Sequence, residues 1–323
     1  MCTAITFSPN EHYFGRNLDL EYTYQEAVTI TPRQFPLPFR RVQNMHEHYA
    51  MIGMATVADG YPLYYDATNE HALSMAGLNF PGNAIYLPET GAKHNIAPFE
   101  FIPYVLAQCK TVCEAMDLIN NTNLADICFS NEYPLTPLHW IIADSMQAIT
   151  VEPTTDGIKI YQNPVGVLTN SPKFDYHLQN LVNYINITAE EAENRFSDRI
   201  DLQPYSNAMG AMGLPGDLSS SSRFVRAAFT KLNSIFGKTP QENISQFFHI
   251  LASVSQQKGC VRLGDKYERT VYTSCCNTLE GIYYYNTYEN NQICQVNMHH
   301  EDLGSNTLIS YPIIREQNIH CVN

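Results

Sequence analysis

The sequence predicts an α+β fold in which two antiparallel β-sheets stack between layers of helices, and three observations favour it. Segments with strand character occupy both ends of the chain, and two clusters of helical character lie between them. Many consecutive strand segments are joined by short turns. The 323 residues contain no internal repeat, linker or low-complexity tract, so one domain spanning residues 1–323 is expected. The pattern alone leaves the order of the layers open.

The strand segments begin with a hairpin at the start of the chain. Residues 4–7 alternate in polarity, a turn follows at Ser8-Pro9-Asn10-Glu11, and residues 13–20 form the second strand. Further strands are expected at residues 26–31, 50–57, 71–78, 138–144, 148–152, 157–161, 270–276, 281–288 and 292–298. A short apolar strand is also expected within residues 163–172, where it leads into a polar loop closed by Pro172.

Helices are expected in the interior of the chain. Residues 98–108 place their apolar side chains on one face. Thr111 is the predicted N-cap of the next helix, and Glu114 three residues later completes a capping box. Two further helices are expected, one after the serine run 219–222 and one over residues 240–257, whereas residues 188–215 form an irregular polar loop.

Composition excludes several kinds of partner. The formal net charge of −13 at pH 7 argues against a nucleic-acid backbone or an anionic membrane surface as partner. No apolar run approaches the ~20 residues that span a bilayer, and the first residues lack the basic and apolar regions of a signal peptide. The protein is therefore expected in the cytoplasm, without a nucleic acid or a membrane as partner.

The nine cysteines are odd in number and scattered along the chain, which disfavours a disulfide framework in that compartment. None of the paired spacings of a zinc site is present, so no metal is expected. Cys109 and Cys113 are predicted on one helix, and Cys275 and Cys276 on one strand. All four are expected to be small buried residues.

Cys2 combines two reactive groups once the initiator methionine is removed. A side chain as small as that of Cys2 permits removal of Met1, which leaves a thiol and a free α-amine on one Cα. An α-amine titrates near ~7.7–8.0, so it can act as a neutral base near physiological pH. This is the arrangement of an N-terminal nucleophile. The alternative is that Cys2 is an ordinary small residue of the first strand.

Arg16 and Asp19, on the predicted second strand, are candidates to act with Cys2. A regular strand places Arg16 and Leu18 on one face and Asp19 on the other. Both charged side chains can reach Cys2 only if the strand ends or bulges between them, as strands often do beside active sites. A surface ion pair of Arg16 with Asp19 or Glu21 is the alternative.

Five short motifs lie in order along the chain: residues 1–3 (MCT), 15–19 (GRNLD), 76–81 (AGLNFP), 168–172 (LTNSP) and 222–224 (SRF). Together with residues 283–290 (YYYNTYEN), they resemble the choloylglycine hydrolase family, which contains bile salt hydrolases and penicillin V acylases. The resemblance covers nearly the whole chain. It implies an αββα four-layer N-terminal-nucleophile hydrolase sandwich, usually a homotetramer, that cleaves an amide without a metal or an organic cofactor.

The resemblance also implies a role for each residue near the nucleophile. The sulfur of Cys2 would attack the amide carbonyl, while its α-amine takes the thiol proton and later returns it to the leaving amine. Arg16 would favour the thiolate, since nearby positive charge lowers the pKa of a thiol. Asp19 would hold the α-amine in place.

Three further residues would serve the oxyanion that forms after attack. The family places donors to this oxyanion at the Asn79 backbone N–H and the Asn170 side-chain amide, and Arg223 would brace the site. Taken alone, each asparagine is equally compatible with an ordinary turn. Arg223 alone could equally be solvated.

The family lines its substrate cleft with loops that correspond here to Leu18, Ala58, Tyr65, Phe129 and Tyr133. The implied substrates are glycine- or taurine-conjugated bile salts, although ordinary packing could also explain the loop aromatics. Asn79 favours bile salts, because penicillin-preferring relatives tend to have tyrosine there. Two alternatives stay open: a penicillin V or N-acyl-homoserine lactone acylase with the same mechanism, and a non-catalytic protein that binds amphipathic steroids.

Overall fold

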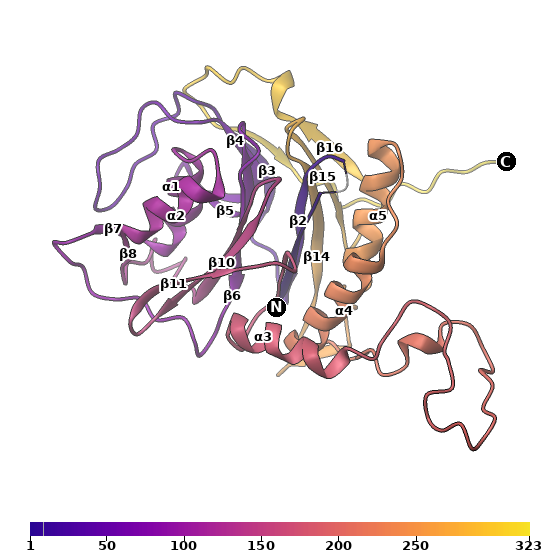
Figure 1. The fold of residues 1–323 in the computed structure, drawn as a ribbon. Coiled ribbons are helices and arrows are strands. Elements are labelled where there is room, and N and C mark those ends of the chain that lie inside the picture. The colour runs from indigo at the N-terminus through magenta and orange to yellow at the C-terminus, as the bar shows by residue number, and fades with distance from the viewer. Residues whose placement is uncertain (9) are drawn as a thin grey trace.

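The computed structural model describes residues 1–8 and 10–323, whose strands form two large sheets packed face to face (Figure 1). Helices lie on both outer sides of this pair of sheets, α1 and α2 on one side and α4 and α5 on the other. These helices are α1 (Phe101–Leu106), α2 (Val112–Asn120), α4 (Ser220–Asn233) and α5 (Pro240–Ala252). The order helix, sheet, sheet, helix confirms the predicted fold class and supplies the layer order that the sequence pattern left open.

The first sheet has seven strands and contains the N-terminal strand in its interior. Its hydrogen-bonded order is β12-β1-β2-β14-β15-β16, and β13 pairs with β14 outside this path. The strands are β1 (Cys2–Phe7), β2 (Tyr13–Leu20), β12 (Val167–Leu168), β13 (Val261–Leu263), β14 (Lys266–Asn277), β15 (Ile282–Thr287) and β16 (Cys294–Asn297). β1 and β2 are the predicted hairpin; its turn includes Pro9, which lies outside the described residues.

The second sheet has eight strands in the order β11-β10-β9-β6-β5-β4-β3-β17. They are β3 (Ala27–Thr31), β4 (Met51–Ala58), β5 (Tyr61–Asn69), β6 (Ser74–Asn79), β9 (Leu138–Ala143), β10 (Ala148–Thr154), β11 (Gly157–Gln162) and β17 (Ile309–Pro312). All neighbours in both sheets are antiparallel. A separate parallel pair is formed by β7 (His94–Ile96) and β8 (Thr122–Leu124).

Along each strand of the second sheet, successive side chains point alternately into two hydrophobic cores, one on each face of the sheet. In β4, Ile52 and Met54 belong to the core that the second sheet shares with β1, β2 and the helices α4 and α5. Met51 and Ala55 of the same strand belong to the core that contains α1 and α2. Both faces of this sheet are therefore buried, which is why several of its strands are apolar along most of their length.

Several elements were absent from the sequence prediction. β5 was missed because Pro62 and Asp66 interrupt its apolar pattern, yet it pairs along both edges within the second sheet. The edge strand β17 was missed as well, as were the short strands β7, β8 and β13 and the helix α3 (Phe174–Asn180). The elements β7, β8, β13, β17 and α3 are too short for a hydrophobic period to be visible in the sequence.

The predicted helix ends need three corrections. Residues 98–108 begin as the 3₁₀ helix η1 (Pro98–Glu100), and α1 ends at Leu106; α5 ends at Ala252 rather than near 257. The Thr111 side chain accepts the Glu114 backbone N–H at 3.2 Å, as predicted. The Glu114 carboxylate, however, accepts from the backbone N–H of Lys110 at 2.6 Å, so the capping box is not closed on Thr111 itself.

The prediction for the cysteines was partly wrong. Cys109 is buried but lies between α1 and α2, so it does not share a helix with Cys113. Cys113 is exposed, and its sulfur accepts from the Gln147 side-chain amide at 3.2 Å. Cys275 and Cys276 are buried in β14, as expected.

The segment between α3 and α4 is irregular, as predicted, apart from two short 3₁₀ turns, η2 (Leu181–Tyr184) and η3 (Met209–Ala211). In Figure 1 it extends away from the sandwich as a long loop. A last 3₁₀ turn, η4 (Met298–His300), follows β16. Within residues 1–8 and 10–323, none of the helices combines the length and apolar character of a membrane crossing.

Candidate active site

Cys2 lies in the wall of a cavity of about 320 Å³. It is the first residue of β1, pairs with Leu18 of β2, and is 2% exposed. β1 is hydrogen-bonded to β2 on one side and to β12 on the other. The position of the chain start is therefore determined by backbone pairing within the sheet, not by the local preference of Cys2.

The cavity wall is mostly aromatic and aliphatic. Four of the five predicted substrate residues line it, namely Leu18, Tyr65, Phe129 and Tyr133. Ala58, the fifth, is buried and is not among the lining residues. Sequence reasoning missed further lining side chains, among them Leu20, Tyr22, Tyr24, Phe99 and Ile102. The apolar wall and the thiol together suit an amphipathic substrate with its reacting group at Cys2.

Arg16 is fully buried and also lines the cavity, which excludes the surface ion pair. Its Nη1 donates to the carbonyls of Tyr65 at 2.9 Å and Gly77 at 2.6 Å. Among the described residues Nη2 has no hydrogen-bond partner. Burial alone would lower the pKa of this guanidinium, but the acidic groups around it, first the Cys2 thiol, hold the pKa above its ordinary value. Arg16 is thus a fixed positive charge beside the thiol.

Asp66 of β5 is a buried carboxylate that sequence reasoning missed. It accepts from the hydroxyls of Tyr272 and Tyr283, both at 2.7 Å, and from Ser274 at 3.3 Å. Burial raises the pKa of Asp66, and the positive charge of Arg16 opposes this shift. The only sign of this carboxylate in the sequence was an aspartate within an otherwise apolar segment. It was overlooked because that segment was not predicted to be a strand.

Asp19 lies opposite an irregularity in the neighbouring strand β14. Asp19 pairs with Thr270 whereas Leu18 pairs with Tyr272, so Val271 is an extra residue on β14. The second strand was expected to end or bulge between Arg16 and Asp19, and this was wrong: β2 continues to Leu20, and the extra residue lies on the partner strand β14. The Asp19 carboxylate accepts from the Thr270 hydroxyl at 2.6 Å. Burial raises the pKa of Asp19, and the positive charges of Arg223 and the chain terminus oppose this.

Met1 occupies the space next to this carboxylate. Its α-amine donates to the Asp19 carbonyl at 2.7 Å and is paired with Glu268. Its carbonyl accepts from the Asp19 backbone N–H at 2.9 Å. Burial lowers the pKa of the Met1 α-amine. An amine at this end of β1 is therefore easier to deprotonate than an exposed one.

The Asn170 side chain connects three parts of the site. Its Oδ1 accepts from the Cys2 backbone N–H at 2.9 Å and from Arg223 Nη2 at 2.7 Å. Its Nδ2 donates to the Asn79 carbonyl at 2.7 Å. Asn79 is the last residue of β6 and lines the cavity. A side-chain amide carries two N–H donors, so one of them is left for a ligand after the bond to Asn79.

Arg223 is fully buried in the first turns of α4, so the solvated alternative is wrong. Its Nη1 donates to the Cys2 carbonyl and to the Thr3 hydroxyl, both at 2.6 Å. Its Nε donates to the Leu218 carbonyl at 3.0 Å. Burial lowers the pKa of Arg223, and the acidic groups Asp19 and Cys2 oppose the shift. Arg223 thus binds Cys2 and Asn170 at once.

All six predicted catalytic residues therefore surround the start of β1, although they come from positions 2 to 223 of the chain. Cys2, Arg16 and Asp19 lie on the β1–β2 hairpin, Asn79 ends β6, Asn170 follows β12 and Arg223 lies on α4. No group of three or more His, Cys, Asp or Glu side chains suited to a metal occurs among the described residues.

Three comparisons with known proteins are relevant to this site. Residues 2–311 match the family described as linear amide C–N hydrolases, choloylglycine hydrolase family. A bile salt hydrolase/transferase of Lactiplantibacillus plantarum is 53% identical over 324 residues, covering 100% of both chains. One of Clostridium perfringens is 38% identical with the same coverage.

Solved structures agree with these sequence matches. A conjugated bile acid hydrolase from Clostridium perfringens superimposes with a TM-score of 0.92 at 38% identity and covers 100% of both chains. A penicillin V acylase from Agrobacterium tumefaciens gives a TM-score of 0.75 at 19% identity, covering 96% of this chain and 90% of its own. The latter likeness concerns the fold alone.

Proposed function

The chain belongs to the choloylglycine hydrolase family of linear amide C–N hydrolases, and we propose that it hydrolyses the amide bond of glycine- or taurine-conjugated bile salts. The observation that carries this proposal is the position of Cys2, next to two buried arginines and in the wall of a largely apolar cavity. The relative that is 53% identical over its full length is named a bile salt hydrolase/transferase. The products are a free bile acid and the amino acid.

The mature nucleophile is Cys2 with its own α-amine, formed when Met1 is removed. The Cys2 backbone N–H donates to Asn170 Oδ1 at 2.9 Å, and this contact suits an amine as well as an amide N–H. Arg16 favours the thiolate by its charge. The α-amine takes the thiol proton when sulfur attacks the carbonyl carbon, and Asp19 orients this amine.

The oxyanion of the tetrahedral intermediate is assigned to the Asn79 backbone N–H and the free N–H of the Asn170 side chain. Support comes from the bond between Asn170 Nδ2 and the Asn79 carbonyl, which brings the two residues together beside the cavity. The α-amine returns the proton to the leaving amino acid, and a thioester remains on Cys2. Water then attacks the thioester and releases the bile acid. These steps use groups of this chain and one water molecule.

The substrate cavity has the character that a steroid requires. Leu18, Tyr65, Phe129 and Tyr133 are proposed to contact the apolar rings. Ala58 is proposed only as packing behind this wall, since it does not line the cavity.

The test is the release of glycine from glycocholate and of taurine from taurocholate, measured with ninhydrin beside penicillin V hydrolysis. The proposal requires the kcat/KM for at least one bile salt to exceed that for penicillin V, and Cys2→Ala to release nothing. A preference for penicillin V or an N-acyl-homoserine lactone would instead support the alternative acylase. Binding of bile salts without any cleavage by the Met1-processed protein would support the non-catalytic alternative.

A second activity is acyl transfer to an amine. Two of the full-length relatives are named hydrolase/transferase. By microscopic reversibility, the space that releases the amino acid can admit another amine to attack the thioester. Incubation of glycocholate with excess taurine should therefore yield taurocholate, detected by mass spectrometry. Formation of free cholate alone would contradict the transfer activity.

We further propose a homotetramer. The loop that extends from the sandwich between α3 and α4 exposes three large apolar side chains, Ile185 (75%), Phe196 (84%) and Tyr205 (83%), which contacts between subunits would bury. Light scattering should give a mass of four times the 36.6 kDa chain. The double substitution Phe196→Ser and Tyr205→Ser should lower it, whereas a wild-type mass of one chain would contradict the proposal.

A cytoplasmic location is proposed on the state of the thiols. All nine cysteines are free among the described residues, which is typical of a reducing compartment. Fractionation of cells that produce the protein should place it with cytoplasmic markers. Recovery in the medium would contradict this.

A further inference from the structure

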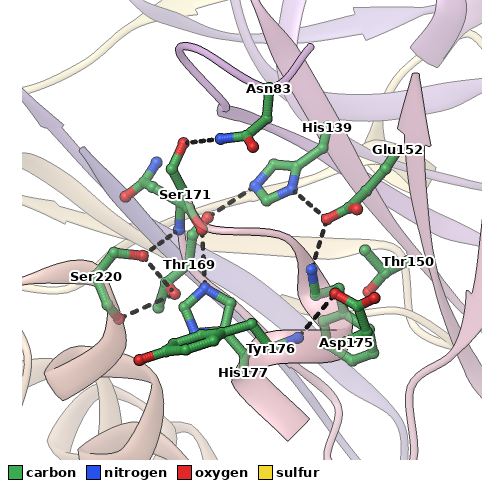
Figure 2. A network of polar contacts seen from close by, with 12 residues as sticks. Asn83, His139, Thr150, Glu152, Thr169, Ser171, Asp175, Tyr176, His177 and Ser220 are labelled. Carbon is green, nitrogen blue, oxygen red and sulfur yellow. Dashed lines mark hydrogen bonds and ion pairs between the residues drawn. The ribbon is translucent and has the colours of Figure 1, made fainter. Parts of the chain in front are cut away.

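A second cluster of buried polar side chains contacts the backbone of Thr169 and Asn170 and has no role in the steps above (Figure 2). Its central members are His139 of β9, Glu152 of β10 and His177 of α3, and all three are 0% exposed. Buried polar groups destabilise a fold unless they are hydrogen-bonded. Their partners therefore indicate what the cluster holds in place.

His139 holds the residue before Asn170. Its Nε2 lies 3.0 Å from the Thr169 carbonyl, and because a carbonyl oxygen can only accept, the ring donates. The ring also stacks on Phe80, with centroids 4.2 Å apart and planes 7° apart. Phe80 follows Asn79 directly in the chain. His139 thus contacts the segments that bear both proposed oxyanion donors.

His177 repeats this arrangement one residue later. Its Nε2 lies 2.9 Å from the Asn170 carbonyl, so this ring also donates. The ring stacks on Phe224, with centroids 4.8 Å apart and planes 20° apart. Phe224 follows Arg223 directly. His177 therefore joins the Asn170 segment to the helix that carries the arginine brace.

Glu152 links the two histidines. Its Oε1 accepts from the Phe174 backbone N–H at 2.9 Å, at the start of the helix that carries His177. The same oxygen lies 3.4 Å from Nδ1 of His139. Figure 2 shows the carboxylate between the imidazole of His139 and the start of α3.

Residues 169–171 are also held by hydrogen bonds to Ser220 and Asn83. Ser220 Oγ accepts from the Asn170 backbone N–H at 2.8 Å and donates to the Thr169 hydroxyl at 3.0 Å. Ser171 Oγ accepts from the Asn83 side chain at 3.0 Å. The backbone of Asn170 is thus hydrogen-bonded at its N–H and at its carbonyl, and the preceding Thr169 carbonyl is bonded as well. These bonds fix the position of the backbone from which the Asn170 side chain extends.

We propose that His139 and His177 are positioning residues for amide hydrolysis, which hold Asn170 in register with Asn79 and Arg223 by donating to the Thr169 and Asn170 carbonyls and stacking on Phe80 and Phe224. The inference rests on the proposed function, in which Asn170 binds the oxyanion. Neither histidine lines the cavity, so both act through Asn170. Misplacement of a catalytic group by about 1 Å can cost about 100-fold in rate.

The test compares His177→Leu, which removes the donor, with His177→Gln, whose amide N–H can replace Nε2. With glycocholate, His177→Leu should lower kcat about 10- to 100-fold and change KM little, because the cavity wall is intact. His177→Gln should recover most of this loss. The matched control is His12→Leu: His12 is also buried and bonded through both ring nitrogens, to Thr6 and Thr278, but lies outside this cluster. It should keep the wild-type kcat.

A double-mutant cycle separates positioning from general damage to the fold. In an Asn170→Ala background, His177→Leu should cause little further loss of kcat, because the residue it positions is already gone. The same fold-loss in both backgrounds would overturn the proposal, as would a wild-type kcat for His177→Leu.

If His177→Leu does not fold, His177→Gln and His177→Asn decide the matter, since glutamine places its amide near Nε2 and asparagine places it near Nδ1. The glutamine variant should have a kcat at least about tenfold higher; equal values would overturn the proposal. Failure of the proposed function itself is distinct, because the wild-type protein would then release no glycine.

Discussion

Arg16 and Arg223 place two permanent positive charges in the interior, and both are fully buried. Buried charges are costly unless they are paired and hydrogen-bonded. Arg223 satisfies most of its donors on Cys2, Thr3, Leu218 and Asn170. Arg16 bonds to three carbonyls, those of Asn17, Tyr65 and Gly77, and Nη2 has no partner among the described residues. The two arginines thus place positive charge next to the Cys2 thiol.

Asp66 should be the counter-charge that makes the burial of Arg16 tolerable. We expect Asp66→Asn to lower the free energy of unfolding by about 3 kcal/mol, since it removes a nearby negative charge that favours the buried charge of Arg16. Urea unfolding at pH 7 measures this loss. Tyr272→Phe, which removes one of the hydroxyl donors to Asp66, should cost only about 1 kcal/mol. Equal losses for both variants would contradict the charge pairing.

Retention of Met1 should abolish turnover although Cys2 is still present. A protein in which removal of Met1 is blocked carries an amide nitrogen on Cys2, which cannot take the thiol proton. Intact mass spectrometry identifies the two forms, and glycine release measures activity. Cys113→Ala, which changes an exposed cysteine outside the cavity, should keep full activity. An active protein that retains Met1 would show that the α-amine is not the base.

At the scale of the elements, a register shift between β2 and β14 sets which residue lies opposite Asp19. Arg16 and Asp19 lie three residues apart on the continuous strand β2, so their side chains point to opposite faces of the sheet. The shift between Thr270 and Tyr272 pairs Asp19 with Thr270, whose hydroxyl donates to the Asp19 carboxylate at 2.6 Å. Residues that are 251 positions apart in the chain thus form this contact.

Thr270→Val should therefore lower kcat about tenfold, whereas Thr270→Ser should retain it, because a hydrogen bond to a buried charge contributes roughly 1.5–3 kcal/mol. The Thr270 hydroxyl lowers the pKa of Asp19, so its loss should raise that pKa. The acidic limb of the pH–kcat profile should accordingly shift to higher pH in Thr270→Val. An unchanged limb would show that Asp19 does not need this donor.

At the scale of the molecule, the sandwich brings the hairpin, β6, the loop after β12 and the start of α4 to one place. The same packing buries histidines in neutral form. Burial lowers the pKa of His12 and of His177 to about 4. In the unfolded chain both titrate near ~6.5. The unfolded state thus binds more protons between these values, and the stability present above pH 6.5 is lost as the pH falls towards 4.

His12→Gln should reduce this acid sensitivity. Over the range from pH 6.5 to 4 it should remove about 3 kcal/mol of the pH-dependent loss of stability, since one pKa unit corresponds to about 1.4 kcal/mol. Urea unfolding of the wild type and the variant at pH 7 and pH 4.5 gives the difference. The wild type must be compared with the variant because the raised pKa values of Asp19 and Asp66 change the stability with pH in the opposite direction. Parallel curves would contradict a neutral buried His12.

Much of the site could be predicted from short motifs, because each motif keeps its residues close in sequence. The hairpin, the cap at Thr111 and the helix after Ser219 were all visible locally. Asp66, His139 and His177 could not be predicted, since each acts through a partner on another element. Ala58 was expected beside the substrate, and it lies outside the cavity wall because the fold, not the loop position, decides which side chains face it.

The sequence by itself was enough to propose the nucleophile, since a thiol and an α-amine on one residue require no folding step to meet. Its short motifs carried the resemblance to the family, and its strand and helix periods, which are local properties, predicted the α+β class. Only the tertiary structure decided the order of the layers, the register shift opposite Asp19, and the burial of Arg16 and Arg223. These depend on contacts between residues up to about 250 positions apart, and such contacts leave no local period in the chain.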